Sequence, residues 1–188
     1  MKQHTLNITD SQITFNTTDD PNTIQQVMMD WEDDLMKAHA DLVCHNKGDI
    51  LEFGFGLGIS ATYIQAHNPT SHTIIETHPQ IIEKAKLWAE GKSNVTIIED
   101  DWIECFDQLG TYDGAFFDTY GDVNYLKFGE KAESLTKSGA HVTWWNALSE
   151  ENNVYGFENV TYTKYDVDPP ENNYFIAKEY YLPLKIYL

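Results

Sequence analysis

The sequence contains no arginine, so its twelve permanently basic side chains are all lysines. The planar fork that grips an anionic ligand through two hydrogen bonds is therefore missing, and a substrate carboxylate has to be bound by lysine, by main-chain N–H groups or by a helix N-terminus. Acidic residues number 30, which gives a formal net charge of −18. This charge predicts that neither nucleic acid nor a membrane surface is a partner.

Cysteines and long apolar runs are also scarce. Cys44 and Cys105 are too few for a disulfide framework in a chain of 188 residues. No apolar run approaches the roughly twenty residues that span a bilayer, and the first residues, MKQHTLNITD, lack the apolar core of a signal peptide. We therefore expect a cytoplasmic location. The even composition predicts a single domain, residues 1–188, with an N-terminal lid or helix region at 1–46 and the core at 47–188.

From residue 49 onward, strand-like and helix-like segments alternate with the spacing of βαβ units. The predicted strands are 49–54, 72–77, 94–100, 112–118 and 140–146, and the predicted helices are 59–67, 79–91, 102–109 and 125–139. The β-branched and aromatic tail predicts an antiparallel hairpin, residues 159–167 and 172–188, around a short turn at 168–173. One more helix is expected at 23–43, outside this core. The predicted fold class is α/β, a doubly wound, Rossmann-like sheet of seven strands, mostly parallel, with the antiparallel hairpin at its C-terminal end.

Three glycines follow the first of these strands, in the segment LEFGFGLGIS. Gly54, Gly56 and Gly58 lie on the first β-to-α turn, where a doubly wound sheet contacts its ligand. Glycine lets a ligand approach the main chain there without a Cβ in the way. The spacing G-x-G-x-G, preceded by Glu52, differs from the G-x-G-x-x-G of dinucleotide folds. A carboxylate at that point disfavours a pyrophosphate and favours a cofactor that carries an ammonium and a sulfonium group.

Acidic residues after the next two strands extend this pattern. Glu76 ends the second strand, where it is placed to bind a ribose diol. Asp101 and Trp102 follow the third strand, where a carboxylate and an indole face could receive an adenine. Taken singly, each feature is equally well explained by turn chemistry, a solvated carboxylate or an acidic helix start. Together they predict S-adenosylmethionine as the cofactor and S-adenosylhomocysteine as the product.

Three further segments, VMMDWEDDLM (27–36), AFFDTYGD (115–122) and TWWNALS (143–149), make the sequence resemble the guanidinoacetate N-methyltransferase family of class I methyltransferases. The resemblance implies methylation of a small guanidino compound, foremost guanidinoacetate to creatine. It also implies that Glu32 and Asp118 hold the guanidinium, that Asp118 takes up a proton, and that the main chain at Ala147 and Leu148 receives the substrate carboxylate. On both grounds together, the residues assigned to the cofactor are Met28, Met36, Glu52, Gly54, Phe55, Gly56, Leu57, Gly58, Ile59, Ser60, Glu76, Thr77, His78, Asp101, Trp102 and Asp118.

Other interpretations stay open at this point. The substrate could be another guanidine, such as free arginine, or a simple amine, and the chain could bind S-adenosylmethionine without transferring its methyl group. Glu32 and Asp118 count against a pure binder, which has no use for a guanidinium clamp, and the loop spacing counts against an NAD-linked oxidoreductase. No metal site is expected, because in KAHADLVCH only Asp41 lies one helical turn from both Cys44 and His45. The chain could be a monomer or a homodimer.

Overall fold

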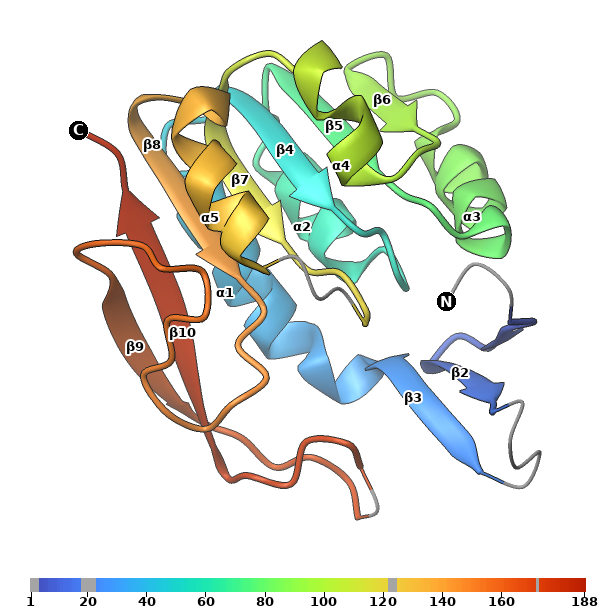
Figure 1. Cartoon of the computed structure of the whole chain (residues 1–188). Coiled ribbons are helices and arrows are strands. Elements are labelled where there is room, and N and C mark those ends of the chain that lie inside the picture. Colours follow the sequence, from blue (N-terminus) through green and yellow to red (C-terminus); the bar gives the residue numbers. More distant parts are fainter. Residues whose placement is uncertain (1–3, 18–22, 122–124, 172) are drawn as a thin grey trace.

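A central sheet with helices on both faces forms the body of the protein (Figure 1), as seen in a computed structural model that describes residues 4–17, 23–121, 125–171 and 173–188. The sheet has seven strands in the order β6 (Val95–Ile98), β5 (Ser71–Ile75), β4 (Asp49–Phe53), β7 (Tyr112–Phe117), β8 (Thr136–Trp144), β10 (Glu179–Ile186) and β9 (Thr161–Asp166). The first five are parallel, and β10 is antiparallel to both β8 and β9. The predicted fold class is confirmed.

Alternate side chains along each strand face different helical layers, as the two-residue period of a strand requires. Ile50 and Phe116 pack with one layer, which consists of α1 (Asp33–Val43), α2 (Ile59–Ala66) and α3 (Pro79–Ala89). Leu51 and Phe117 pack with the other, which consists of α4 (Trp102–Cys105) and α5 (Tyr125–Ala132). Short 3-10 turns adjoin three of these helices, namely η1 (Asp30–Glu32) before α1, η2 (Phe106–Gln108) after α4 and η3 (Glu133–Leu135) after α5. Within the described ranges, no helix combines the length and the apolar character that crossing a membrane requires.

The N-terminal segment corrects the prediction in two respects. Part of the expected helix is instead strand β3 (Ile24–Met29), which pairs antiparallel with β2 (Gln12–Asn16), and β2 pairs with β1 (Asn7–Ile8). Pairing with the preceding strand, β2, therefore overrides the helical spacing of the apolar residues. The helix that follows, α1, is not outside the core, because Met36 and Val43 are completely buried between it and the sheet.

The C-terminal hairpin also differs from the prediction, because its connecting segment is longer. β9 ends at Asp166 and β10 begins only at Glu179. Polar groups of this connection bond to β3 instead of to β9. Asn173 Nδ2 donates to Met29 Sδ at 2.7 Å, and Tyr174 N donates to Gln26 Oε1 at 2.7 Å. The connection is thereby fastened to the N-terminal part of the chain.

Candidate active site

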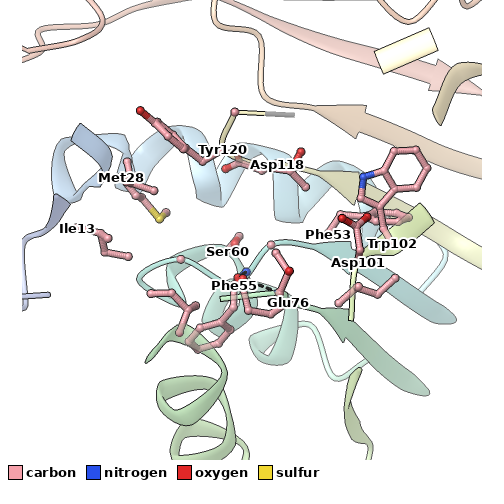
Figure 2. Close-up of a pocket in the computed structure, with 18 of the residues that line it drawn as sticks. Ile13, Met28, Phe53, Phe55, Ser60, Glu76, Asp101, Trp102, Asp118 and Tyr120 are labelled. Carbon is pink, nitrogen blue, oxygen red and sulfur yellow. Dashed lines mark hydrogen bonds between the residues drawn. The ribbon is translucent and has the colours of Figure 1, made fainter. Parts of the chain in front are cut away.

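A cavity of about 460 Å³ lies beyond the carboxyl ends of β4, β5 and β7, and β2 and β3 contribute to its wall. Figure 2 shows Met28 and Asp118 on one side of it, Phe55 and Glu76 on the other, and Trp102 at one end. The sequence-predicted residues that line it are Met28, Gly54, Phe55, Gly56, Ser60, Glu76, Thr77, Asp101, Trp102 and Asp118. The glycine turn and the acidic strand ends predicted to form one site are thus brought together.

Two glycines of the turn allow parts of the chain to approach one another closely. Gly54 has a φ of +88°, and a Cβ on it would lie 2.1 Å from the carbonyl oxygen of Asp118. Gly56 has a φ of +53°, and a Cβ on it would lie 2.4 Å from Met28 Sδ. Any side chain at these positions would be strained and would push β3 or the end of β7 away from the cavity.

Glu76 holds the chain around the cavity from the end of β5. Its Oε2 accepts a hydrogen bond from Phe55 N at 3.0 Å, and its Oε1 accepts from Thr77 N at 2.7 Å and from His78 N at 2.8 Å. The carboxylate therefore shapes the glycine turn in addition to any contact with a ribose, which stays a prediction. Next to it, Thr77 Oγ1 is buried and has no hydrogen-bond partner among the residues that the structure describes.

Asp101 and Trp102 form the far end of the cavity. Asp101 Oδ1 accepts a hydrogen bond from Ile103 N at 3.0 Å and so caps α4. Trp102 is buried and packs edge-to-face against Phe53, with ring centroids 6.1 Å apart. Capping and packing hold both residues in place, and their contact with an adenine stays a prediction.

Several residues predicted to contact the cofactor do not line the cavity: Met36, Glu52, Leu57, Gly58, Ile59 and His78. Met36 is buried in the core, and Gly58 and Ile59 begin α2. The His78 side chain turns to the backbone of Gln80 and of His4. These positions support the wall of the cavity from behind it.

Glu52 is the most informative of these differences. It is completely buried on the face of β4 that carries Ile50, where Ser60 Oγ donates to its Oε1 and His72 Nε2 lies 2.9 Å from its Oε2. Ser60 lines the cavity, so Glu52 lies one residue behind the wall. Its charge still reaches Asp118, whose pKa it raises.

The two carboxylates predicted to hold the guanidinium lie near one another. Burial raises the pKa of Glu32 to about 8, and the nearby charge of Asp118 adds to this rise. Burial also raises the pKa of Asp118 to about 7, with further contributions from Glu52 and Glu76. No lysine lines the cavity in the described part of the chain, so no permanent cation of the protein neutralises this group of acids there.

Tyr174, which the sequence did not identify, completes the surroundings of Glu32. Glu32 Oε1 accepts a hydrogen bond from Met29 N at 2.8 Å, and a hydrogen bond from Tyr174 lowers the pKa of Glu32 against the effect of burial. The Tyr174 ring lies 6.4 Å from that of Trp31 and 6.5 Å from that of Trp145. The carboxylate is therefore held from two sides and flanked by aromatic rings.

The turn after β8, which the resemblance assigned to the substrate carboxylate, stands apart from the cavity. Ala147 and Leu148 are exposed and do not line it. Leu148 N already donates to Asn146 Oδ1 at 3.3 Å. The main-chain N–H of Ala147 is therefore the better candidate of the two.

The sequence also missed residues that line the cavity, among them His4, Ile13, Val27 and Tyr120. His4 and Ile13 come from the start of the chain, where no motif predicted a place near the glycine turn, whereas Val27 begins the segment VMMDWEDDLM. Tyr120 carried a signal, because it belongs to the segment AFFDTYGD. Its ring packs edge-to-face on Phe15 at 5.9 Å and so connects the end of β7 to β2.

A sequence model of the guanidinoacetate N-methyltransferase family matches residues 3–166, which is most of the chain. The chain belongs to this family. This match confirms the family resemblance and the assignment of the chain to a family of S-adenosylmethionine-dependent methyltransferases, whose cofactor is S-adenosylmethionine.

Curated relatives carry a different name. Protein arginine N-methyltransferase 2 of Yarrowia lipolytica is 34% identical over 164 residues, which cover 79% of this chain and 33% of the relative. Its counterpart in Candida glabrata is 40% identical over 112 residues, covering 54% of this chain and 27% of the relative. The chain thus spans about a third of the length of these relatives.

Solved structures share the fold. Spermidine synthase from Thermotoga maritima superposes with a TM-score of 0.65 at 12% identity, covering 97% of this chain and 72% of that one. A caffeoyl-CoA O-methyltransferase-like protein from Staphylococcus aureus, described as putative, has a TM-score of 0.59 at 20% identity, covering 86% and 85%. At these identities the likeness shows the fold alone.

The residues of the cavity fit S-adenosylmethionine. Thr77 Oγ1 is a buried polar atom without a protein partner among the described residues, and such atoms are rare unless a ligand or water satisfies them. The turn at Gly54 and Gly56 leaves bare main chain at the cavity wall. Acidic side chains line the cavity and no lysine does so among the described residues, which suits a ligand that carries a sulfonium and an ammonium group.

Proposed function

We propose that this chain transfers a methyl group from S-adenosylmethionine to a nitrogen of a guanidino group held between Glu32 and Asp118. The observation that carries the proposal is the convergence of these two carboxyl groups, from η1 and from the end of β7, in surroundings that raise both pKa values. Ionised carboxylates are costly to bury without a cation. A bound guanidinium would supply that cation.

The shape of a guanidinium suits two carboxylates. It is planar, and its N–H groups are arranged in pairs that match the two oxygens of a carboxylate. Carboxylates on two edges fix both the position and the rotation of the group, and such positioning lowers the barrier to reaction. Glu32 is held in advance by Met29 N and by Tyr174, so little reorganisation is needed when the substrate enters.

Proton uptake is the proposed task of Asp118. S-adenosylmethionine, when bound, supplies an electrophilic methyl group on a positively charged sulfur. A guanidinium has no free lone pair, so an N–H proton must leave the attacking nitrogen as the new N–C bond forms. The bond between the methyl group and sulfur would break at the same time, and its electron pair would stay on sulfur to leave the neutral thioether S-adenosylhomocysteine. Asp118 accepts this proton, because a pKa of about 7 is close to the operating pH of a general base. When the guanidinium binds, its positive charge favours the ionised form of Glu32, and the Glu32 carboxylate faces the remaining N–H groups of the substrate.

Two substrates are candidates. Guanidinoacetate is the first, because the family that the chain belongs to is named for it. An arginine side chain in a polypeptide is the second, because the fungal relatives are named protein arginine N-methyltransferase 2. The two differ beyond the guanidino group, where the first has a carboxylate and the second a peptide main chain. The absence of lysine from the described cavity wall means that main-chain N–H groups, with Ala147 as the candidate, would have to bind a carboxylate.

The test is a methyl-transfer assay with four acceptors. The full chain is incubated with S-adenosylmethionine and guanidinoacetate, free arginine, an arginine-containing peptide or a simple amine, and products are detected by mass spectrometry. We expect a methylated guanidino product that is lost in Asp118→Asn and kept in Asp107→Asn, a matched change at an exposed position of η2. Methylation of the amine alone, or binding of the cofactor with no methylated product from any acceptor, would contradict the proposal.

A further inference from the structure

A buried chain of hydrogen bonds lies next to the proposed substrate site and has no part in the proposed chemistry. At its centre is His39 of α1, which is completely buried. His39 Nδ1 lies 2.8 Å from Thr143 Oγ1 of β8, and His39 Nε2 lies 2.9 Å from the Tyr180 hydroxyl of β10. Thr143 Oγ1 donates to Pro183 O at 2.5 Å, and Asn146 N donates to the Tyr180 hydroxyl at 2.9 Å.

These contacts determine the direction of every bond in the chain. Thr143 has one hydroxyl proton and donates it in the hydrogen bond to Pro183 O, so its oxygen must accept a hydrogen bond from the Nδ1–H of His39. A neutral imidazole that is protonated on Nδ1 accepts a hydrogen bond at Nε2, and the Tyr180 hydroxyl donates it. The Tyr180 oxygen is then free to accept from Asn146 N. Burial lowers the pKa of His39 to about 3, which agrees with a neutral ring.

A cationic His39 ring, or a neutral ring protonated on Nε2, would leave a buried group without a hydrogen-bond partner. Protonation on Nε2 would direct two donors, that N–H and the main-chain N–H of Asn146, at the Tyr180 oxygen, and the Tyr180 proton would lose its acceptor. A buried donor without an acceptor is unfavourable. The neutral form of His39 protonated on Nδ1 is the one that satisfies all the atoms of the chain.

This network of hydrogen bonds around His39 connects the elements that carry the proposed substrate contacts. Glu32 is the N-cap residue of the helix that bears His39. Phe116, two residues before Asp118, stacks on the His39 ring with centroids 4.5 Å apart. Asn146 begins the turn after β8 that contains the proposed main-chain contact at Ala147. A single buried network thus contacts both carboxylate-bearing elements and the turn.

Asn146 passes this constraint to the whole turn. Its Nδ2 donates to Glu150 O at 2.9 Å and to Tyr181 O at 2.9 Å, and its Oδ1 accepts from Leu148 N at 3.3 Å. The main-chain N–H of Asn146 donates to the Tyr180 hydroxyl. The hydrogen bonds of Asn146 therefore join β10 to the turn at residues 146–150. Loss of the Tyr180 hydroxyl would release the turn at its first residue.

We propose that His39 and Tyr180 are positioning residues, which hold the turn at residues 146–150 at a set distance from Glu32 and Asp118 and so determine how tightly the far end of the substrate is bound. This inference rests on the proposed function, because the turn acts on a substrate only if the guanidino group lies between the two carboxylates. The hydrogen-bond chain itself does not depend on it.

The kinetic test removes one hydroxyl at a time. Tyr180→Phe is expected to raise KM for the guanidino substrate about tenfold, the equivalent of one lost hydrogen bond, with kcat and cofactor affinity within about twofold of wild type. Tyr181→Phe is the matched control, since the neighbouring Tyr181 hydroxyl donates to Glu179 Oε2 at 3.2 Å and takes no part in the His39 hydrogen-bond network. Thr143→Val is expected to raise KM and Thr143→Ser, which keeps the hydroxyl, to restore it.

A spectroscopic test applies whether or not the substrate is right. In ¹⁵N NMR spectra of the full chain, the His39 ring is expected to carry its proton on Nδ1 at neutral pH, and Tyr180→Phe is expected to shift the Asn146 amide signal where Tyr181→Phe does not. A proton on Nε2, a cationic ring, or an equal KM for the two tyrosine variants would overturn the inference. If the wild-type chain methylates no guanidino compound, the proposed function fails and the NMR signals still decide the hydrogen-bond chain.

Discussion

Replacement of Glu32 by glutamine tests the pair of carboxyl groups most directly, because it removes the charge and nearly keeps the shape. In the folded chain the pKa of Glu32 is about 8, against an ordinary value of 4.5. Between these values the folded protein keeps a proton that the unfolded chain loses. The stability contributed by this proton is fully present below about pH 4.5 and is lost as the pH rises through 8. At about 1.36 kcal/mol per pKa unit, the loss is on the order of 5 kcal/mol.

The assay is denaturant unfolding at a series of pH values between about 5 and 8, without ligand. The free energy of unfolding of the wild type is expected to fall over this interval, and Glu32→Gln is expected to remove most of the fall, leaving the part due to Asp118. Glu130→Gln, a matched change at an exposed position of α5, should keep the wild-type slope. A slope that is unchanged in Glu32→Gln would refute the idea that this carboxyl is protonated in the folded protein.

The same variant separates a substrate role from a structural one. Glu32→Gln is expected to raise KM for a guanidino substrate by about 10- to 100-fold, since a hydrogen bond to a charged group contributes about 1.5–3 kcal/mol. Cofactor affinity, measured by calorimetry, should stay near the wild-type value, because Glu32 does not line the cavity. An equal loss of cofactor affinity would show that Glu32 only supports the start of α1.

Three further changes probe the site. Asp118→Asn is expected to lower the single-turnover rate of methyl transfer by about 10²- to 10⁴-fold, while calorimetry and thermal melting show that cofactor affinity and fold are retained. A near-normal rate in a stable variant would exclude Asp118 as the base. Gly56→Ala should weaken S-adenosylhomocysteine binding in calorimetry, because its Cβ would lie 2.4 Å from Met28 Sδ. Tyr174→Phe removes a hydrogen bond that lowers the pKa of Glu32, so Glu32 should ionise at a higher pH in this variant. KM for the guanidino substrate should then reach its minimum at a higher pH than in the wild type. An unshifted pH profile of KM would argue against that bond.

The sequence alone was enough for the sheet and for the residues next to it along the chain. The apolar strands that lead directly to Gly54, Glu76 and Asp118 have a local signal, since a strand and the turn that follows it are encoded by adjacent residues. Parallel strands bring their carboxyl ends to one edge, so the glycine turn, Glu76, Asp101 and Asp118 could be placed together in advance.

Side-chain direction within a strand was available from the same pattern and was missed for Glu52. Successive residues of a strand face opposite sides, so Glu52 lies on the face of Ile50, next to His72, and Phe53 lies on the face that reaches the cavity. The position of Glu52 just before the glycine turn predicted a contact with the cofactor. The alternation of side chains along β4 instead predicts that Glu52 faces away from the cavity.

Only the tertiary structure determined which distant segments meet at the site. Even between neighbouring segments a strand pairing can decide the outcome: the spacing from residue 23 predicts a helix, yet β3 forms there because it pairs with the preceding strand, β2. Tyr174 reaches Glu32, and Tyr180 reaches His39, because the C-terminal segment folds back on the start of the chain. Contacts between residues more than a hundred positions apart depend on how whole elements pack, and no local pattern encodes that. The sequence by itself therefore determined the sheet and the acids at its edge, while packing decided which buried partners hold those acids and set their pKa values.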